Sequence, residues 1–117
     1  MNFESLRQYL LGKPGASEEF PFGPSAMVFK VRGKMFALIA VQETPMRLNL
    51  KCDPELALHL RAMYEAVKPG YHMNKKHWNT VTIDGTLPDE EIITMINDSY
   101  DLVVKGLPQG DRKSLGV

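Results

Sequence analysis

Cysteine is nearly absent from this 117-residue sequence, which contains one, Cys52. One cysteine excludes a disulfide within the chain, so we expect a reducing compartment. Long apolar runs are also missing, because the longest, residues 35–41, is far too short to span a bilayer. The first residues lack the basic start and apolar run of a signal peptide. These absences predict a cytoplasmic protein that does not associate with membranes.

Net charge is also lacking, since 14 Lys and Arg residues balance 14 Asp and Glu residues. This balance argues against bulk attraction to nucleic acid. The charge is nevertheless uneven: residues 30–81 carry nine basic residues against four acids, and both flanking segments are net acidic. One basic face could therefore dock an anionic partner, and solvated charges with a chance imbalance are the alternative.

Hydrophobic spacing predicts three helices and five strands in one domain, residues 1–117, with no internal repeat. The expected helices are residues 2–11, 53–67 and 88–105, and the expected strands are 26–31, 34–41, 46–51, 71–73 and 78–83. We expect residues 16–24 to form a loop and the polar tail from Gln109 to be frayed. The order, helix, three strands, helix, two strands, helix, predicts an α+β two-layer sandwich with helices on one face of a five-stranded antiparallel sheet.

The same spacing predicts which side chains are buried. In the strand 46–51, alternation directs Met46, Leu48 and Leu50 inward and Arg47, Asn49 and Lys51 outward. The helix 53–67 is expected to bury Leu56, Leu60, Met63, Tyr64 and Val67, and the last helix Ile92, Ile96, Tyr100, Val103 and Val104. Phe20 and Phe22 are expected to pack their loop onto the domain.

Residues 67–81 stand apart from the rest of the chain. They contain its one tryptophan, two of its three histidines and three lysines, and no acid. A buried core has no reason to collect such residues around one large aromatic side chain. The composition therefore indicates a functional surface.

Several blocks follow a recognisable pattern: 20–23 (FPFG), 28–31 (VFKV), 33–37 (GKMFA), 48–51 (LNLK), 53–56 (DPEL), 87–91 (LPDEE), 98–103 (DSYDLV) and, most specifically, 70–81 (GYHMNKKHWNTV). Together they resemble the MmcQ/YjbR family of small bacterial proteins over nearly the whole chain. The resemblance implies a CyaY-like or secretion-chaperone-like domain with a double-wing shape and, through that shape, DNA binding. It supplies no catalytic residues.

The leading hypothesis is non-enzymatic binding of double-stranded DNA or another polyanion. Lysine and arginine would contact phosphates, while tryptophan or histidine would stack on a base or sugar. The candidate residues are Lys30, Arg32, Arg47, Asn49, Lys51, His72, Lys75, Lys76, His77 and Trp78. By the alternative interpretation, Trp78 is a packed anchor and the lysines keep a hairpin soluble.

Other chemistries have less support in the sequence. His72 and His77 flank a turn but do not complete a metal site. Cys52 precedes a helix start, where a dipole could activate a thiol, yet strand alternation directs it inward as an inert group. We therefore expect no metal, cofactor or catalytic residue. The main alternative function is a protein- or peptide-binding module that uses the open face of the sheet, and an exposed apolar patch would favour it.

Overall fold

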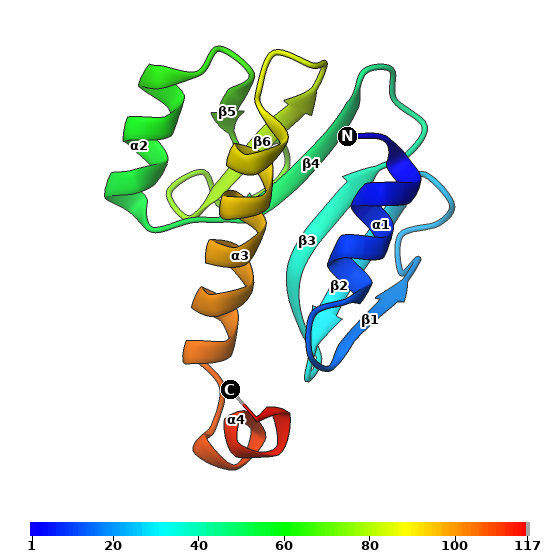
Figure 1. Ribbon diagram of the computed structural model, residues 1–117, viewed down its shortest axis with the longest axis vertical. Coiled ribbons are helices and arrows are strands. Elements are labelled where there is room, and N and C mark those ends of the chain that lie inside the picture. The colour runs from blue at the N-terminus through cyan, green and yellow to red at the C-terminus, as the bar shows by residue number, and fades with distance from the viewer. Residues whose placement is uncertain (117) are drawn as a thin grey trace.

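The computed structural model describes residues 1–116 and shows an α+β fold built on one six-stranded antiparallel sheet (Figure 1). The strands lie in the order β1-β2-β3-β4-β6-β5. Their bounds are β1 Ala16–Glu19, β2 Ala26–Val31, β3 Lys34–Ala40, β4 Met46–Lys51, β5 Val67–Pro69 and β6 Trp78–Ile83. The expected α+β class is confirmed, whereas the expected count of five strands is wrong.

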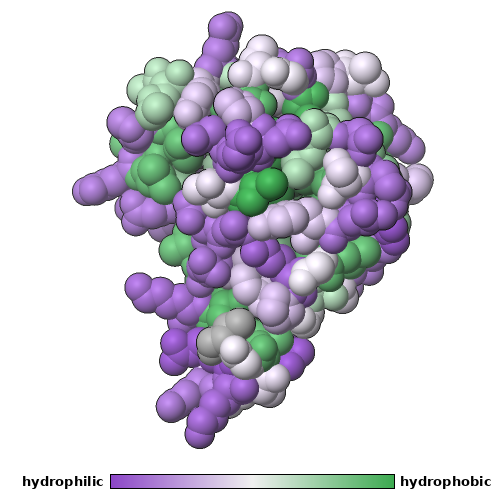
Figure 2. All heavy atoms as spheres, viewed as in Figure 1, coloured by the Kyte–Doolittle hydropathy of each residue, from purple (hydrophilic) through white to green (hydrophobic). Residues whose placement is uncertain are grey.

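Four helices accompany the sheet, and they are α1 Phe3–Leu11, α2 Pro54–Met63, α3 Asp89–Lys105 and α4 Gln109–Leu115. In Figure 1, α1 and α3 lie in front of the sheet, α2 lies beside β5, and α4 lies beyond one end of the sheet. Figure 2 shows this helix-covered side, where hydrophilic side chains predominate. Within residues 1–116, every helix is too short or too polar to cross a bilayer.

The core lies between the sheet and the helices α1 and α3. The predicted inner face of α3 is confirmed, since all five of its expected side chains are buried. Leu6 and Leu10 of α1 are fully buried against the same sheet face. Leu48 and Leu50 complete this layer from β4, as alternation predicts. Apolar periodicity therefore identifies the core where an element is long and packs on one side.

Strand β1 was expected to be part of a loop. Its residues pair with β2, from Ala16 opposite Val31 to Glu19 opposite Val28. Glu18 Oε1 lies 2.5 Å from a guanidinium nitrogen of Arg7 in α1, and Glu19 Oε1 lies 2.5 Å from Lys30 Nζ. The sequence Ala-Ser-Glu-Glu has little intrinsic strand preference, so its extended conformation depends on pairing with β2.

The segment after α2 also differs from the prediction. The helix ends at Met63 because Tyr64 adopts an extended backbone, and strand β5 follows at Val67–Pro69 instead of residues 71–73. Val67 is fully buried opposite Val81, and His72 has a positive φ of 59°, which excludes a strand there. Pro69 suits an edge strand because it has no N–H to donate.

Helix α2 packs less tightly than its apolar residues suggest. Its fully buried residue is Ala57, whereas Leu56 and Met63, which were expected to be buried, are exposed. The predicted helix start is confirmed, because Asp53 accepts hydrogen bonds from the backbone N–H groups of Glu55 and Leu56. The helix lies at the edge of the sheet, where one neighbour covers only part of its apolar surface.

The C-terminal segment was expected to be a frayed tail but forms α4. Its half-buried Leu115 packs against the core. Arg32 Nη2 donates to Ser114 Oγ at 2.9 Å, so the turn between β2 and β3 meets α4. One apolar and one polar contact therefore connect α4 to the rest of the domain.

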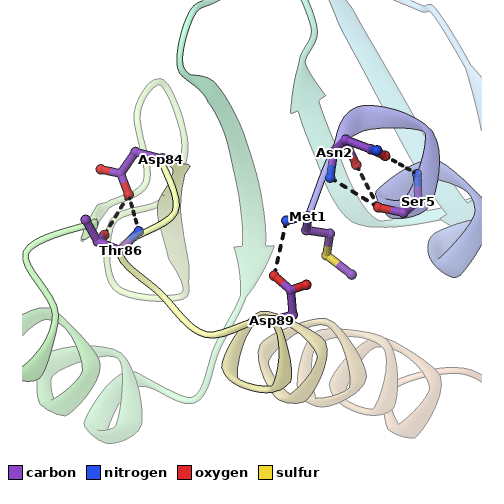
Figure 3. Close-up of polar contacts among 6 residues, drawn as sticks. All are labelled: Met1, Asn2, Ser5, Asp84, Thr86 and Asp89. Atoms are coloured by element: carbon purple, nitrogen blue, oxygen red, sulfur yellow. Dashed lines mark hydrogen bonds and ion pairs between the residues drawn. The ribbon is translucent and has the colours of Figure 1, made fainter.

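Local polar contacts fix the two chain segments that lead into α1 and α3 (Figure 3). Asn2 and Ser5 form a reciprocal capping box at the start of α1. Asp84 accepts hydrogen bonds from the N–H and hydroxyl of Thr86, and the Met1 amino group lies 3.1 Å from Asp89 Oδ1. The last contact connects the starts of α1 and α3, which are remote in sequence.

Candidate functional site

Strand alternation gives the sheet a second face, which α1 and α3 do not cover. Leu38, Asn49 and Thr80 lie next to one another on β3, β4 and β6, and all three line a hollow on this face. Ala40 and Arg47 form the adjacent pair and line the same hollow. The predicted outward orientation of Arg47 and Asn49 is therefore confirmed.

This hollow, which we call the open-face trough, has a volume of about 710 Å³. The strands form its floor, residues 22–25 form one wall, and residues 71–73 form the other. Its lining consists of Phe22, Ser25, Ala26, Met35, Leu38, Ala40, Gln42, Glu43, Arg47, Asn49, Tyr71, His72, Met73 and Thr80. Half of these side chains are apolar or aromatic, and apolar atoms make up most of the surface that they expose, so the trough suits a partner with apolar groups.

Two aromatic side chains stand at the walls of the trough. Phe22 is 72% exposed and Tyr71 is 58% exposed. Phe20, on the other side of its loop, is 47% exposed. The expectation that the phenylalanines pack the loop onto the domain is therefore wrong for Phe22, which contributes an apolar surface to the trough, whereas Phe20 borders Phe3, Met27 and Val41.

A directed chain of hydrogen bonds runs along the trough floor. The Tyr71 N–H donates to Thr80 Oγ1 at 2.9 Å, and the Thr80 hydroxyl donates to Asn49 Oδ1 at 2.5 Å. Asn49 is only 6% exposed, so its amide is held in one position. Because the oxygen of the amide already accepts from Thr80, the NH₂ group is the end that can donate to a ligand.

Arg47 is held between two groups of the trough. Its guanidinium donates from Nε and Nη2 to the two carboxylate oxygens of Glu43. The guanidinium carbon also lies 5.2 Å from the centre of the Tyr71 ring, over its face. The Tyr71 ring in turn lies 4.0 Å from the His72 ring, centre to centre. These contacts place the positive charge of Arg47 beside an aromatic wall.

The structure brings three of the ten sequence-predicted site residues into the trough, namely Arg47, Asn49 and His72. Lys30 forms an ion pair with Glu19, and Arg32 points to α4. Lys51 and Trp78 are half-buried neighbours on β4 and β6 that do not line the trough. The other seven, Lys30, Arg32, Lys51, Lys75, Lys76, His77 and Trp78, are therefore not part of the trough lining.

The predicted second hairpin forms between β5 and β6, with its first strand at Val67–Pro69 instead of residues 71–73, and its connection, residues 70–77, is a compact loop that carries Lys75 and Lys76. Lys75 Nζ donates to the Gly70 carbonyl at 3.1 Å. The backbone N–H of Lys76 donates to Asn74 Oδ1, and the Lys76 side chain is exposed. The His77 carbonyl accepts from the Cys52 N–H at 2.8 Å, which ties the loop to the start of α2. These contacts order the loop, and Lys75 contributes to them through its side chain.

Trp78 packs against the base of this loop. A Cβ atom added to Gly70 would lie 2.8 Å from Trp78 Cβ, so only glycine fits there. The Trp78 carbonyl accepts from the Gly70 N–H at 2.8 Å and from Arg61 Nη2 at 3.3 Å. The half-buried position favours the interpretation of Trp78 as a packed anchor.

The residues that the structure describes contain no group of three or more His, Cys, Asp or Glu residues placed to hold a metal ion. Cys52 is 6% exposed and lies beside Leu60, Met95 and Asp98. Burial, with the nearby charges of Asp98 and Asp53, raises the pKa of the Cys52 thiol from 9.0 to about 11. This environment is the opposite of the one that activates a nucleophilic cysteine.

We expect Cys52 to react with iodoacetamide about 100-fold more slowly in the folded protein than in the urea-unfolded chain at mildly alkaline pH. Each unit by which the pKa is raised lowers the thiolate fraction about tenfold. Mass spectrometry over time measures the two rates, and Cys52→Ser should take up no label. Equal rates would contradict the buried, inert thiol.

The sequence did not reveal several lining residues, among them Phe22, Met35, Glu43, Tyr71 and Thr80. One signal was present: strand β3 is apolar on both faces, and Met35, Leu38 and Ala40 occupy the face away from α1 and α3. A strand that is apolar on both faces, next to the alternating strand β4, indicates that the second face of the sheet also needs to be covered there. The two walls come from loops, which periodicity does not describe.

The chain is similar to known proteins over most of its length. The YjbR family model matches residues 11–102. The uncharacterized protein YjbR of Escherichia coli K12 is 39% identical over 115 residues, which cover 98% of both chains. The uncharacterized protein YbdF of Escherichia coli O157:H7 is 40% identical over 94% of this chain and 90% of its own.

A solved structure shows the same fold. The crystal structure of Deinococcus radiodurans protein DR2400, with family-model domain DUF419, is 42% identical and superimposes with a TM-score of 0.92. The match covers 97% of this chain and 87% of that chain. The resemblance found in the sequence blocks is thus confirmed, and the chain belongs to the YjbR family.

Proposed function

We propose that the protein is a non-enzymatic binding module whose open-face trough holds apolar side chains of a partner polypeptide. The observation that carries this proposal is the composition of the lining. It combines exposed aromatic residues, methionines and an arginine, which are the residue types enriched in the cores of protein interfaces. Within the described chain, lysine is absent from the lining and Glu43 is its one acid.

The shape and flexibility of the lining suit side chains rather than a rigid surface. Phe22 and Tyr71 stand on opposite walls, where each can cover one side of an inserted apolar group. Met35 and Met73 add flexible, polarisable side chains, which adapt to groups of different shape. The floor around Leu38 supplies the apolar area that stabilises the bound state.

Charge supports a polypeptide over duplex DNA as the partner. Arg47, the one Lys or Arg in the lining of the described trough, is neutralised by Glu43, and Lys30 is neutralised by Glu19. DNA affinity depends on several cations that contact phosphates together. Duplex DNA binding through residues 70–78 therefore stands as the competing outcome of the test.

A two-dimensional amide NMR titration tests the proposal with acetyl-Leu-Leu-Val amide and, separately, with a short DNA duplex. We expect the uncharged peptide to shift signals of trough residues on β3 and β4 and of the two walls. Leu38→Asp should lower the affinity for the peptide by about tenfold or more, because the new carboxylate would lose its hydration when the peptide fills the trough. Phe22→Ser should weaken it without affecting folding, since Phe22 is 72% exposed.

Leu58→Asp is the matched control, because Leu58 is 64% exposed on α2, away from the trough lining. It should leave the peptide titration unchanged. The proposal would be overturned if the peptide caused no shifts, or if the two trough variants bound it as tightly as the unmodified protein does. Salt-sensitive shifts with DNA in residues 71–82, without any peptide shifts, would establish the polyanion hypothesis in its place.

A further inference from the structure

The trough contains an arginine whose present partner is a carboxylate of the same chain. Glu43 lies in the connection between β3 and β4, and its two oxygens accept from Nε and Nη2 of Arg47. This is the two-point geometry in which a guanidinium binds any carboxylate. Both side chains line the trough, so the pair lies within reach of a bound molecule.

Arg47 is positioned independently of Glu43. It belongs to β4, where it is paired between Ala40 of β3 and Thr82 of β6. The Tyr71 ring contacts its guanidinium as well, with 5.2 Å between the guanidinium carbon and the ring centre. Glu43, by contrast, lies outside any strand, and its side chain is 41% exposed. Loss of the Glu43 contact would therefore leave the arginine in place, because the strand and the ring still hold it.

The polar groups near Arg47 also favour an acceptor. Asn49 lies two residues along β4, and its amide oxygen is occupied by Thr80, which leaves the NH₂ group to donate. Hydrogen bonding to Glu43 raises the pKa of Arg47, and the same bond lowers the pKa of Glu43. The pair is therefore ionised at neutral pH, and an incoming carboxylate that takes the place of Glu43 would again form an ion pair with Arg47.

We propose that Arg47 binds the terminal carboxylate of the partner peptide and that Glu43 occupies this position until the peptide displaces it. Ala40 lies directly opposite Arg47, and Leu38 lies opposite Asn49, so the carboxylate site borders the apolar floor. A peptide C-terminus presents these two groups together, since its carboxylate and last side chain share one carbon. This inference rests on the proposed function, because the peptide must first enter the trough.

The test compares acetyl-Leu-Leu-Val with a free carboxylate and the same peptide as its amide, by dissociation constants from amide NMR titration. We expect the free acid to bind roughly tenfold more tightly, as a charge-assisted hydrogen bond allows. A third peptide, acetyl-Leu-Asp-Val amide, carries the carboxylate on a side chain. We expect it to bind no more tightly than acetyl-Leu-Leu-Val amide, because its carboxylate is not on the last residue.

Two variants connect the preference to the proposed residues. Glu43→Gln keeps the side-chain shape and removes the competing charge. It should therefore raise the affinity for the free-acid peptide severalfold and leave the affinity for the amide peptide unchanged. Arg47→Gln should make the two peptides bind equally. Both residues are at least one-third exposed, and neither change opens a core cavity.

The outcomes separate this inference from the proposed function. Equal binding of acid and amide by the unmodified protein would overturn the role of Arg47 and leave the trough as an apolar binding site. Tighter binding of the side-chain carboxylate than of the terminal one would also overturn it. Failure of both tripeptides to shift any trough signal would overturn the inference together with the proposed function.

Discussion

Phe36→Ala is expected to lower the free energy of unfolding by about 3–5 kcal/mol, as removal of a fully buried phenylalanine generally does. The Phe36 ring is 0% exposed and packs edge-to-face on Tyr100, with 5.3 Å between ring centres. The pairing of β2 with β3 moves from Phe29–Ala37 to Lys30–Met35, so Phe36 is an extra residue that turns toward the helices. Truncation would leave a cavity between β3 and α3.

Urea denaturation followed by circular dichroism measures this loss. Phe22→Ala is the matched control, because it makes the same chemical change at a site that is 72% exposed. Its effect should lie within about 0.5 kcal/mol. Similar losses in both variants would contradict the assignment of Phe36 to the core and of Phe22 to the trough wall.

Ser99→Ala is expected to lower the free energy of unfolding by about 2 kcal/mol, since it leaves two backbone groups without their hydrogen-bond partner. The Ser99 hydroxyl is fully buried, donates to the Phe36 carbonyl at 2.6 Å and accepts from the Lys51 N–H at 2.9 Å. The pairing of β3 with β4 begins one residue further on, at Ala37 and Leu50. Ser99 of α3 therefore replaces the missing contact between the two strands.

The same denaturation experiment tests this role. Thr94→Ala removes an exposed hydroxyl from the same helix and should change the stability little. Hydrogen exchange adds a local measurement, because the Lys51 amide should lose protection in Ser99→Ala and keep it in Thr94→Ala. A Ser99→Ala protein as stable as the unmodified one would contradict the bridging role.

The predicted fold was most accurate where one element makes one long apolar face. Helix α3 shows five expected buried residues at helical spacing, and β4 directs Leu48 and Leu50 to the core and Asn49 to the other face, so local pattern and tertiary packing agree. The edges of the sheet were predicted less well. Strands β1 and β5 are short, and the residues of β1 are largely polar, so their pairing depends on neighbours that are distant in sequence.

The site was predicted in part, through the outward residues of β4. Arg47 and Asn49 follow from alternation, and His72 from its unusual segment. The lysines of that segment indicated a basic surface, but Lys75 folds back onto Gly70 and Lys30 pairs with Glu19. Their partners come from backbone turns and from β1, which composition and periodicity do not specify.

The sequence by itself determined the α+β class, the inner face of α3, the alternation of residue types in β4 and membership of the YjbR family, because each depends on local spacing or on the order of residue types along the chain. Only the tertiary structure decided the trough. Phe22 and Tyr71, on its walls, come from two loops that lie 49 positions apart in the sequence and line the same hollow over strands β3, β4 and β6. The physical reason is that a side chain on a loop takes its position from the surface against which the loop packs, and that surface exists only after the sheet has formed.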